Sequence, residues 1–367
     1  MSDAPTFVVE YLEEALVEPM PEEFSPSRVR RALFVLAAVI VVVAVVVALL
    51  PGLGAVREAF SGARPGLLAL AAVLEIGSCL SYVLAFRGVF CQRMRWLTSY
   101  EIGTAELAAN SLLSVGGAGG LALGAWILRR GGVPASQIAR RTVAFFLITS
   151  LANVVALIVA GIGLGTGVLH GAPSAAYGFI PAGVAIGGIL LVLFARVVAA
   201  RLALRSERER LVRALESLAD GVGEALSLLR TRERTILIGA AGYMLFDVAM
   251  LGVCFAAFDD AIPPVGVLLV AYLIGQLGGL IPIPGGIGGV DGGLIGTLVL
   301  FGVDVTDATV AVLAYRGLLL FIPALVGLPA LAVLRSRLRR ETHDIAACAP
   351  GQEVDVLGVG RVRRGIA

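Results

Sequence analysis

The chain has 367 residues, of which 58% are hydrophobic and 15% are charged, with a net charge of +2 and a mean hydropathy of +0.93. This composition is far more apolar than a soluble domain needs to fill its core, so it excludes a soluble globular protein. We predict an all-α integral membrane protein, a polytopic helical bundle of about six spans, because the apolar runs are much longer than barrel strands of roughly ten residues.

The first 30 residues form an acidic segment that we expect to be a cytoplasmic tail. Residues 1–27 hold seven acids and no base, and arginines at 28, 30 and 31 then precede the first apolar run. Because arginines accumulate on the cytoplasmic side, the N-terminus is predicted inside and the membrane domain covers 31–335. The expected spans are Leu33–Leu50, Leu67–Phe86, Thr142–Leu169, Ala172–Ala195, Thr235–Phe258 and Ala308–Leu334.

The apolar stretch Ile102–Leu128 does not fit a simple crossing. One crossing would put the arginines at 129, 130, 140 and 141, and two later arginine clusters, on the outer face. The glycine run Gly116–Gly120 could interrupt the helix here. If the chain then returned to the cytoplasmic side as a hairpin, all three arginine groups would lie on that side, as the positive-inside rule requires. We therefore predict a re-entrant hairpin of two half-helices that meet near the membrane midplane.

A second glycine-rich run lies in Ala261–Val303, where GLIPIPGGIGGVDGGL covers 279–294 and Asp291 is the one charge. The arm after this run is about 14 residues, or about 21 Å, which is shorter than the hydrocarbon core of about 30 Å. We favour a second re-entrant hairpin, entering from outside, and two full crossings are the alternative. The order span, hairpin, span then occurs twice in opposite orientation, which predicts an inverted repeat with halves at about 66–200 and 235–335.

The segments outside the two halves carry weaker signals. Residues 201–234 place leucines at helical spacing and predict a cytoplasmic amphipathic helix on the inner leaflet. Its eight arginines are offset by six acids, so we expect no nucleic-acid partner. Residues 336–367 are expected to be a cytoplasmic tail, poorly ordered after Arg340. The cysteines lack metal or disulfide spacing and are predicted to be apolar filler; they are Cys79, Cys91, Cys254 and Cys348.

The glycine-rich breaks predict a polar cavity inside the membrane. Unpaired backbone groups at that depth are tolerated only beside protein or water, and the start of each second arm offers free N–H groups that suit a phosphate. Close packing of small residues is the alternative for Gly116–Gly120. The substrate-binding candidates in the breaks are Gly117, Gly119, Gly285, Gly286 and Gly288.

Ionisable side chains inside the spans are further candidates, because they are costly in a membrane unless paired or wet. Asp291 either caps its helix or serves the site. Arg316 lies about 12 Å into the last span, where it can hold an anion or snorkel, and we expect Asp247 as its structural partner. The remaining candidates are Glu75, Glu106 and Asn110, although an asparagine is more often interhelical hydrogen-bonding glue.

No pattern in the sequence indicates catalysis. Gly117–Ala122 fits a dinucleotide-binding spacing but follows no strand, and no phosphate-binding loop is present. The two histidines, His170 and His343, are predicted on opposite faces of the membrane. We expect no enzyme activity, no catalytic residue, no cofactor and no metal.

The segment Pro282–Asp291 and the later pair Tyr315–Arg316 resemble a flippase-like family that includes the transmembrane region of lysylphosphatidylglycerol synthetases. Members carry P-x-P-G-G-x-G-x-x-E at this place, where this chain ends in aspartate, and a tyrosine-arginine pair in the next helix. The resemblance covers most of residues 67–335 but departs at Gly116–Gly120, where many members have an R-x-G-E-like segment. Further matching segments are NSLL at 110–113 and RRGGVP at 129–134.

The resemblance implies movement of aminoacylated phospholipids or lipid-linked sugars across the bilayer, and it adds Tyr315 to the substrate-binding candidates. Only 33 residues follow Leu334, with no counterpart of a soluble aminoacyl-transferase domain, so the resemblance implies a stand-alone translocase. The leading hypothesis is a flippase for a phospholipid or lipid-linked glycan in the cytoplasmic membrane, with both termini cytoplasmic. Because no ATP site is visible, movement would be downhill or ion-coupled.

Other functions stay open at this point. A small-solute or ion-coupled secondary transporter would use the same architecture. A non-transporting docking partner of a lipid or cell-envelope synthase would use residues 201–234, and a headgroup enzyme would need a nucleophile or metal cluster that the sequence lacks. The expected ligand is a membrane lipid or lipid-linked sugar, and a homo-oligomer or a cytoplasmic lipid-modifying enzyme remain open as protein partners.

Overall fold

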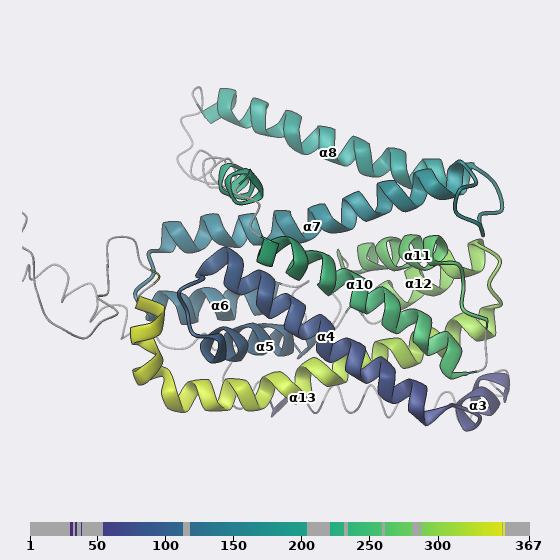
Figure 1. The fold of residues 1–367 in the computed structure, drawn as a ribbon, viewed down its shortest axis with the longest axis horizontal. Coiled ribbons are helices and arrows are strands. Elements are labelled where there is room, and N and C mark those ends of the chain that lie inside the picture. The colour runs from purple at the N-terminus through teal and green to yellow at the C-terminus, as the bar shows by residue number, and fades with distance from the viewer. Residues whose placement is uncertain are drawn as a thin grey trace, which may run out of the picture.

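Long apolar helices dominate the fold (Figure 1). The computed structural model describes residues 54–112, 118–203, 221–230, 234–258, 261–280, 286, 288–346 and 348, with single residues at 30, 31, 34 and 38. Four helices are long and apolar enough to cross a membrane: α4 (Pro65–Phe90), α7 (Ala135–Gly165), α10 (Arg234–Ala257) and the Val305–Leu334 part of α13 (Val305–Ala346). The prediction of a polytopic helical membrane protein is confirmed.

The centre of the molecule is an antiparallel pair, α4 against α10 (Figure 1). At one end the Arg64 backbone N–H donates to the Ala257 carbonyl over 2.7 Å, so the start of α4 lies beside the end of α10. Further along, a Cβ added to Gly239 would lie 2.5 Å from the Ala85 nitrogen. The two backbones therefore touch, which only a residue without a side chain allows, and this is a common way for membrane helices to pack.

Each glycine-rich segment lies next to two short helices, although residues 113–117, 281–285 and 287 are outside the described residues. In the first hairpin α5 (Trp96–Leu112) is followed by α6 (Ala118–Arg130), and the two pack together. In the second, α11 (Val265–Leu277) and a 3₁₀ turn (Gly278–Leu280) precede α12 (Gly289–Leu300), which packs on α11. At 1.5 Å per residue α11 and α12 are only about 20 Å and 18 Å long.

The two halves repeat one arrangement in opposite directions. The first half runs α4, hairpin, α7 and the second runs α10, hairpin, α13, and the hairpins lie at opposite ends of the molecule (Figure 1). Each hairpin packs on the third helix of the other half: α5 on α13, where a Cβ on Gly327 would lie 2.0 Å from the Thr104 carbonyl oxygen, and α11 on α7. This exchange of partners is what an inverted repeat produces.

Two further segments flank the first half. Helix α8 (Ala176–Ala203) packs along α7, where a Cβ on Gly178 would lie 2.3 Å from the Gly161 carbonyl oxygen. Residues 221–230 are helical, and a Cβ on Gly221 would lie 2.4 Å from Val143 of α7. The described part of the predicted amphipathic helix buries Val222 and Ala225 against protein, and its position on the inner leaflet stays a prediction. Residues 204–220 and 231–233, like most of Leu33–Leu50, lie outside the described residues.

The C-terminal segment differs from the sequence prediction. We expected a poorly ordered end after Arg340, but α13 passes through Pro323 and Pro329 and continues to Ala346. Ile345 is fully buried and packs on the turn after α6, where a Cβ on Gly131 would lie 2.1 Å from its side chain. A single large apolar residue at the end of a charged segment gives too little periodicity for the sequence to predict this docking.

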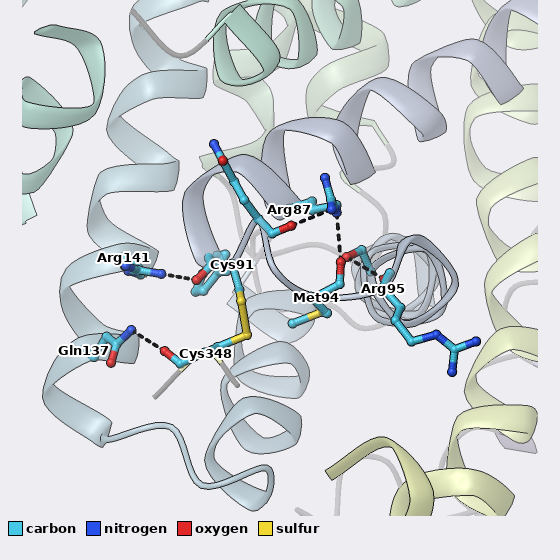
Figure 2. Close-up of a disulfide and its surroundings, with 10 residues drawn as sticks. Arg87, Cys91, Met94, Arg95, Gln137, Arg141 and Cys348 are labelled. Carbon is cyan, nitrogen blue, oxygen red and sulfur yellow. Dashed lines mark hydrogen bonds between the residues drawn. A yellow bond between two sulfur atoms is a disulfide. The ribbon is translucent and has the colours of Figure 1, made fainter. Parts of the chain in front are cut away.

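A disulfide joins Cys91, after α4, to Cys348, after α13 (Figure 2). The bonded residues are 257 positions apart, with a Cα–Cα distance of 5.6 Å. Around the bond, the Gln137 amide donates to the Cys348 carbonyl over 3.1 Å and the Arg141 guanidinium donates to the Phe90 carbonyl. The prediction that all four cysteines are apolar filler is wrong for this pair, since so long a separation leaves no local spacing. The other two are buried and free.

Candidate substrate site and intramembrane polar groups

The second hairpin carries an ion pair at the start of α12. Arg316 Nε donates to Asp291 Oδ1 over 2.7 Å, and the Gly288 backbone N–H donates to Asp291 Oδ2, also over 2.7 Å. The side chains of Arg316 and Asp291 are 8% and 19% exposed. Capping and function were the two alternatives for Asp291, and the carboxylate makes both contacts: it caps α12 and fixes the arginine from α13.

The glycine loop before α12 lies directly against this ion pair. Gly286 and Gly288 have φ angles of 66° and 86°, a region that residues with side chains rarely adopt. A Cβ on Gly286 would be 3.5 Å from Arg316 Nη2, so Gly286 lies beside the guanidinium. Four predicted site residues, Gly286, Gly288, Asp291 and Arg316, therefore meet at one place, while Gly285 lies outside the described residues.

The expected pairing of Arg316 with Asp247 is wrong, because Arg316 pairs with Asp291. Asp247 instead accepts hydrogen bonds from Ser78 Oγ on α4, over 2.6 Å, and from the Tyr272 hydroxyl on α11, over 2.9 Å. Tyr315 and Arg316 are neighbours in sequence but project about 100° apart on the helix, so they serve different groups.

Glu75, Asp247 and Tyr315 belong to a second group, which we call the central acid group, where α4, α10, α11 and α13 meet. Glu75 is 2% exposed and Asp247 is 1% exposed. The Cys79 thiol donates to Glu75 Oε1 over 3.8 Å, whereas Glu75 Oε2 and the fully buried Tyr315 hydroxyl have no hydrogen-bond partner. The sequence reasoning missed three members of this group: Ser78, Cys79 and Tyr272.

A helical signal for two of the missed residues was present. Ser78 and Cys79 lie three and four positions after Glu75, so they share its face of α4. Tyr272 has no such signal, because it reaches Asp247 from a different helix. Only the tertiary packing brings its hydroxyl to the carboxylate.

The third group lies in the first hairpin. The Tyr82 hydroxyl donates to Glu106 Oε2 over 2.8 Å, and Asn110 Oδ1 accepts the Gly120 backbone N–H over 2.8 Å. Asn110 thereby caps the first turn of α6, which favours the structural interpretation of this residue. Glu106 lies closely against Gly124, since a Cβ there would overlap its carboxylate. Gly119 lies in the first turn of α6, and Gly117 falls outside the described residues.

An apolar groove of about 740 Å³ lies between α6 and α7. Trp126 and Arg129 contribute from α6, and Ile138 and Thr142 from α7. Its lining includes none of the predicted site residues. The groove is thus a feature of the first hairpin, separate from the ion pair of the second.

Comparison with known families gives one decisive result. The sequence matches the model of the lysylphosphatidylglycerol synthase TM region over residues 34–327. This range contains both hairpins and the Asp291–Arg316 pair, and it exceeds half of the chain. The chain belongs to this family. Among curated proteins, no significant match to the sequence was found.

The lysylphosphatidylglycerol synthase TM family places the chain among membrane proteins of lipid and cell-envelope synthesis. In this family member the three polar groups differ in charge. The second hairpin combines a buried guanidinium with the N-terminus of α12, and both favour an anion. The central acid group and the Glu106–Tyr82 pair offer carboxyls with neutral donors. Of the three groups, the second hairpin is therefore the one suited to a phosphate.

Proposed function

We propose that the protein is a translocase that moves a phospholipid or lipid-linked glycan across the cytoplasmic membrane, and that it is not an enzyme. The observation that carries the proposal is the Arg316–Asp291 pair, held under a glycine loop where α12 begins inside an otherwise apolar hairpin. A buried ion pair is a weak source of stability, so a pair at this depth needs another reason to be present.

The phosphate of the amphiphile would bind at this pair. Arginine has five N–H donors in a planar fork that matches a phosphate, and Asp291 takes the Nε donor in the structure. An arriving phosphate would compete with Asp291 for the guanidinium and receive backbone N–H groups at the start of α12. When no substrate is bound, Asp291 then occupies the place of the substrate anion, so that the arginine always has an anionic partner.

Both hairpins are proposed to be re-entrant, with the termini on the cytoplasmic side. Helices of about 18–20 Å are too short to cross a core of about 30 Å, which supports this for α11 and α12. The arginine-rich end of α6 and the start of α7 support a cytoplasmic side for the first hairpin. Alternating access would come from one inverted half rocking against the other around α4 and α10.

The test is transbilayer movement in proteoliposomes of labelled phosphatidylglycerol, its lysyl ester and a polyprenyl-phosphate sugar. Asp291→Asn and Arg316→Gln should each abolish movement of the lipid that wild type moves. Gly296→Ala is the matched control on α12, because nothing lies within 4 Å of the added Cβ, and it should keep the wild-type rate.

The outcomes separate the proposal from its rivals. If folded Asp291→Asn and Arg316→Gln proteins both move lipid at the wild-type rate, the assignment of the ion pair is wrong. If wild type moves none of the three lipids but releases a small solute from the same vesicles, the protein is a solute transporter.

A further inference from the structure

The central acid group places one carboxyl from each half of the protein at the contact between them. Glu75 comes from α4 of the first half and Asp247 from α10 of the second, and both are almost fully buried. Within the described part of the chain, the hydrogen bonds to these carboxyls come from neutral donors: Ser78, Cys79 and Tyr272. The proposed phosphate contact at Asp291 and Arg316 uses neither acid.

Two polar atoms at this contact lack a hydrogen-bond partner. One is Glu75 Oε2, and the other is the hydroxyl of Tyr315, which is 0% exposed and lies within electrostatic range of both Glu75 and Asp247. Buried polar atoms are nearly always hydrogen-bonded, so an unpaired oxygen and an unpaired hydroxyl near the same acids indicate a missing ligand. The tyrosine is an observation independent of the acids themselves.

The missing ligand has to bring positive charge. Two carboxylates buried near each other cannot both remain ionised, because each loses several kcal/mol of hydration and each repels the other. One proton on the pair removes a charge, and it turns an acceptor-only carboxylate into a hydrogen-bond donor. The proton then belongs to the pair rather than to either residue.

We propose that Glu75 and Asp247 form a proton-binding site, and that proton uptake and release there accompany the rocking of the two halves. The proton enters from one side of the membrane, binds the carboxyl pair and leaves to the other side, so charge and mass balance without another reactant. The coupling of proton movement to lipid movement rests on the proposed translocase function. The existence of the proton-binding site does not.

The location of the site explains how its charge would reach the substrate. Asp247 is hydrogen-bonded by Tyr272 of α11, which is an arm of the substrate hairpin. Tyr315 precedes Arg316 on α13, so the acid group and the Asp291–Arg316 pair lie on adjacent faces of one helix turn. A change of protonation that weakens the packing of α4 on α10 would therefore shift α11 and α13 together.

Other titratable groups around the site are accounted for. Beside Cys79 on α4 and Tyr272 on α11, Tyr243 on α10 and Tyr315 on α13 lie within electrostatic range of Asp247. Arg316 on α13 is engaged by Asp291. From α5, Glu106 is hydrogen-bonded by the Tyr82 hydroxyl.

A proton fits better than a sodium ion. Sodium sites in transporters use carbonyls from unwound helices, but Glu75 and Asp247 lie in the unbroken helices α4 and α10. Both oxygens of Asp247 already accept hydrogen bonds from hydroxyl groups, which leaves little room for them to coordinate a metal ion. A proton needs only one lone pair.

The binding test is a pH titration of purified full-length protein in lipid nanodiscs, followed by infrared difference spectroscopy of the carboxyl stretch. Wild type should show a protonated carboxyl that deprotonates as the pH rises, and Glu75→Gln should lose this band. Asp247→Asn should shift its midpoint, because the neighbouring charge is gone. Glu58→Gln, an exposed acid on α3 (Gly54–Ser61), is the control and should leave the band unchanged.

The coupling test uses the same variants in proteoliposomes with an imposed proton gradient. The gradient should accelerate lipid movement by wild type and by Glu58→Gln, and Glu75→Gln should lose the acceleration. Absence of a titrating carboxyl that depends on Glu75 overturns the site, as does acceleration by a sodium gradient alone. If wild type moves lipid at the same rate with and without the proton gradient, the coupling is refuted. A titrating carboxyl in a protein that moves no lipid leaves the site standing and refutes the lipid function.

Discussion

The Cys91–Cys348 disulfide gives a prediction that tests both the fold and the membrane orientation. Both cysteines lie at the end of the molecule where arginines follow α4 and α6. In the proposed orientation the arginines lie on the cytoplasmic side, where thiols are kept reduced. We therefore predict that the two thiols are reduced in growing cells and that the bond forms when the purified protein is oxidised.

The bond should stabilise the oxidised protein measurably. It closes a loop of 257 residues, for which the chain-entropy relation gives an upper bound of about 5.5 kcal/mol. Measured disulfides typically contribute about 2–4 kcal/mol. With an unfolding entropy of about 2.1 cal/mol/K per residue over this chain, reduction should lower the melting temperature by about 3–5 °C.

The assay is thermal unfolding of the air-oxidised protein in detergent micelles, with and without a reductant. The double variant Cys91→Ser and Cys348→Ser should melt near the reduced wild type and ignore the reductant, because Cys79 and Cys254 stay unpaired. If mass spectrometry of the oxidised protein finds no linked peptide, the docking of the C-terminal segment is wrong. A bond found in untreated cells would instead place this end outside the cytoplasm and invert the proposed orientation.

Two further predictions concern the first hairpin. Gly327→Ala should cost about 1–3 kcal/mol, because the added Cβ would lie 2.0 Å from the Thr104 carbonyl oxygen where α13 crosses α5. Gly317→Ala on the same helix has nothing within 4 Å, so equal melting temperatures for the two variants would refute the close crossing. Asn110→Ala should cost about 1 kcal/mol and speed amide exchange at Gly120, whereas Asn110→Asp keeps the acceptor; unchanged exchange in Asn110→Ala would contradict the cap.

Hydropathy and glycine content predicted the arrangement of helices because both act locally. A run of apolar residues specifies a span, and a cluster of several glycines destabilises a helix locally. In the described residues α5 ends at Leu112, α6 begins at Ala118 and α12 begins at Gly289. Arginine counts then ordered these elements into opposed halves, and the packing of α5 on α13 and of α11 on α7 agrees with that order.

Contacts between distant residues could not be predicted in the same way. Asp247 and Asp291 were both reasonable partners for Arg316, since each is an isolated acid in an apolar helix. The choice depends on which face of α13 carries Arg316, and the face follows from packing that hydropathy does not encode. The same argument applies to Tyr272, whose hydroxyl is indistinguishable in sequence from that of any other buried tyrosine.

The two hairpins share one capping contact, but it serves a different purpose in each. In each, a side-chain oxygen accepts a backbone N–H at the start of the second arm: Asn110 for Gly120, and Asp291 for Gly288. The first acceptor is a neutral amide, and among the described residues its hydrogen bond completes the turn without a cation. The second is a carboxylate that also holds Arg316. Because a cap alone needs no charge, the extra charge in the second hairpin points to a role that the first does not share. Under the proposed function this role is substrate recognition, and one half of the inverted repeat then provides it.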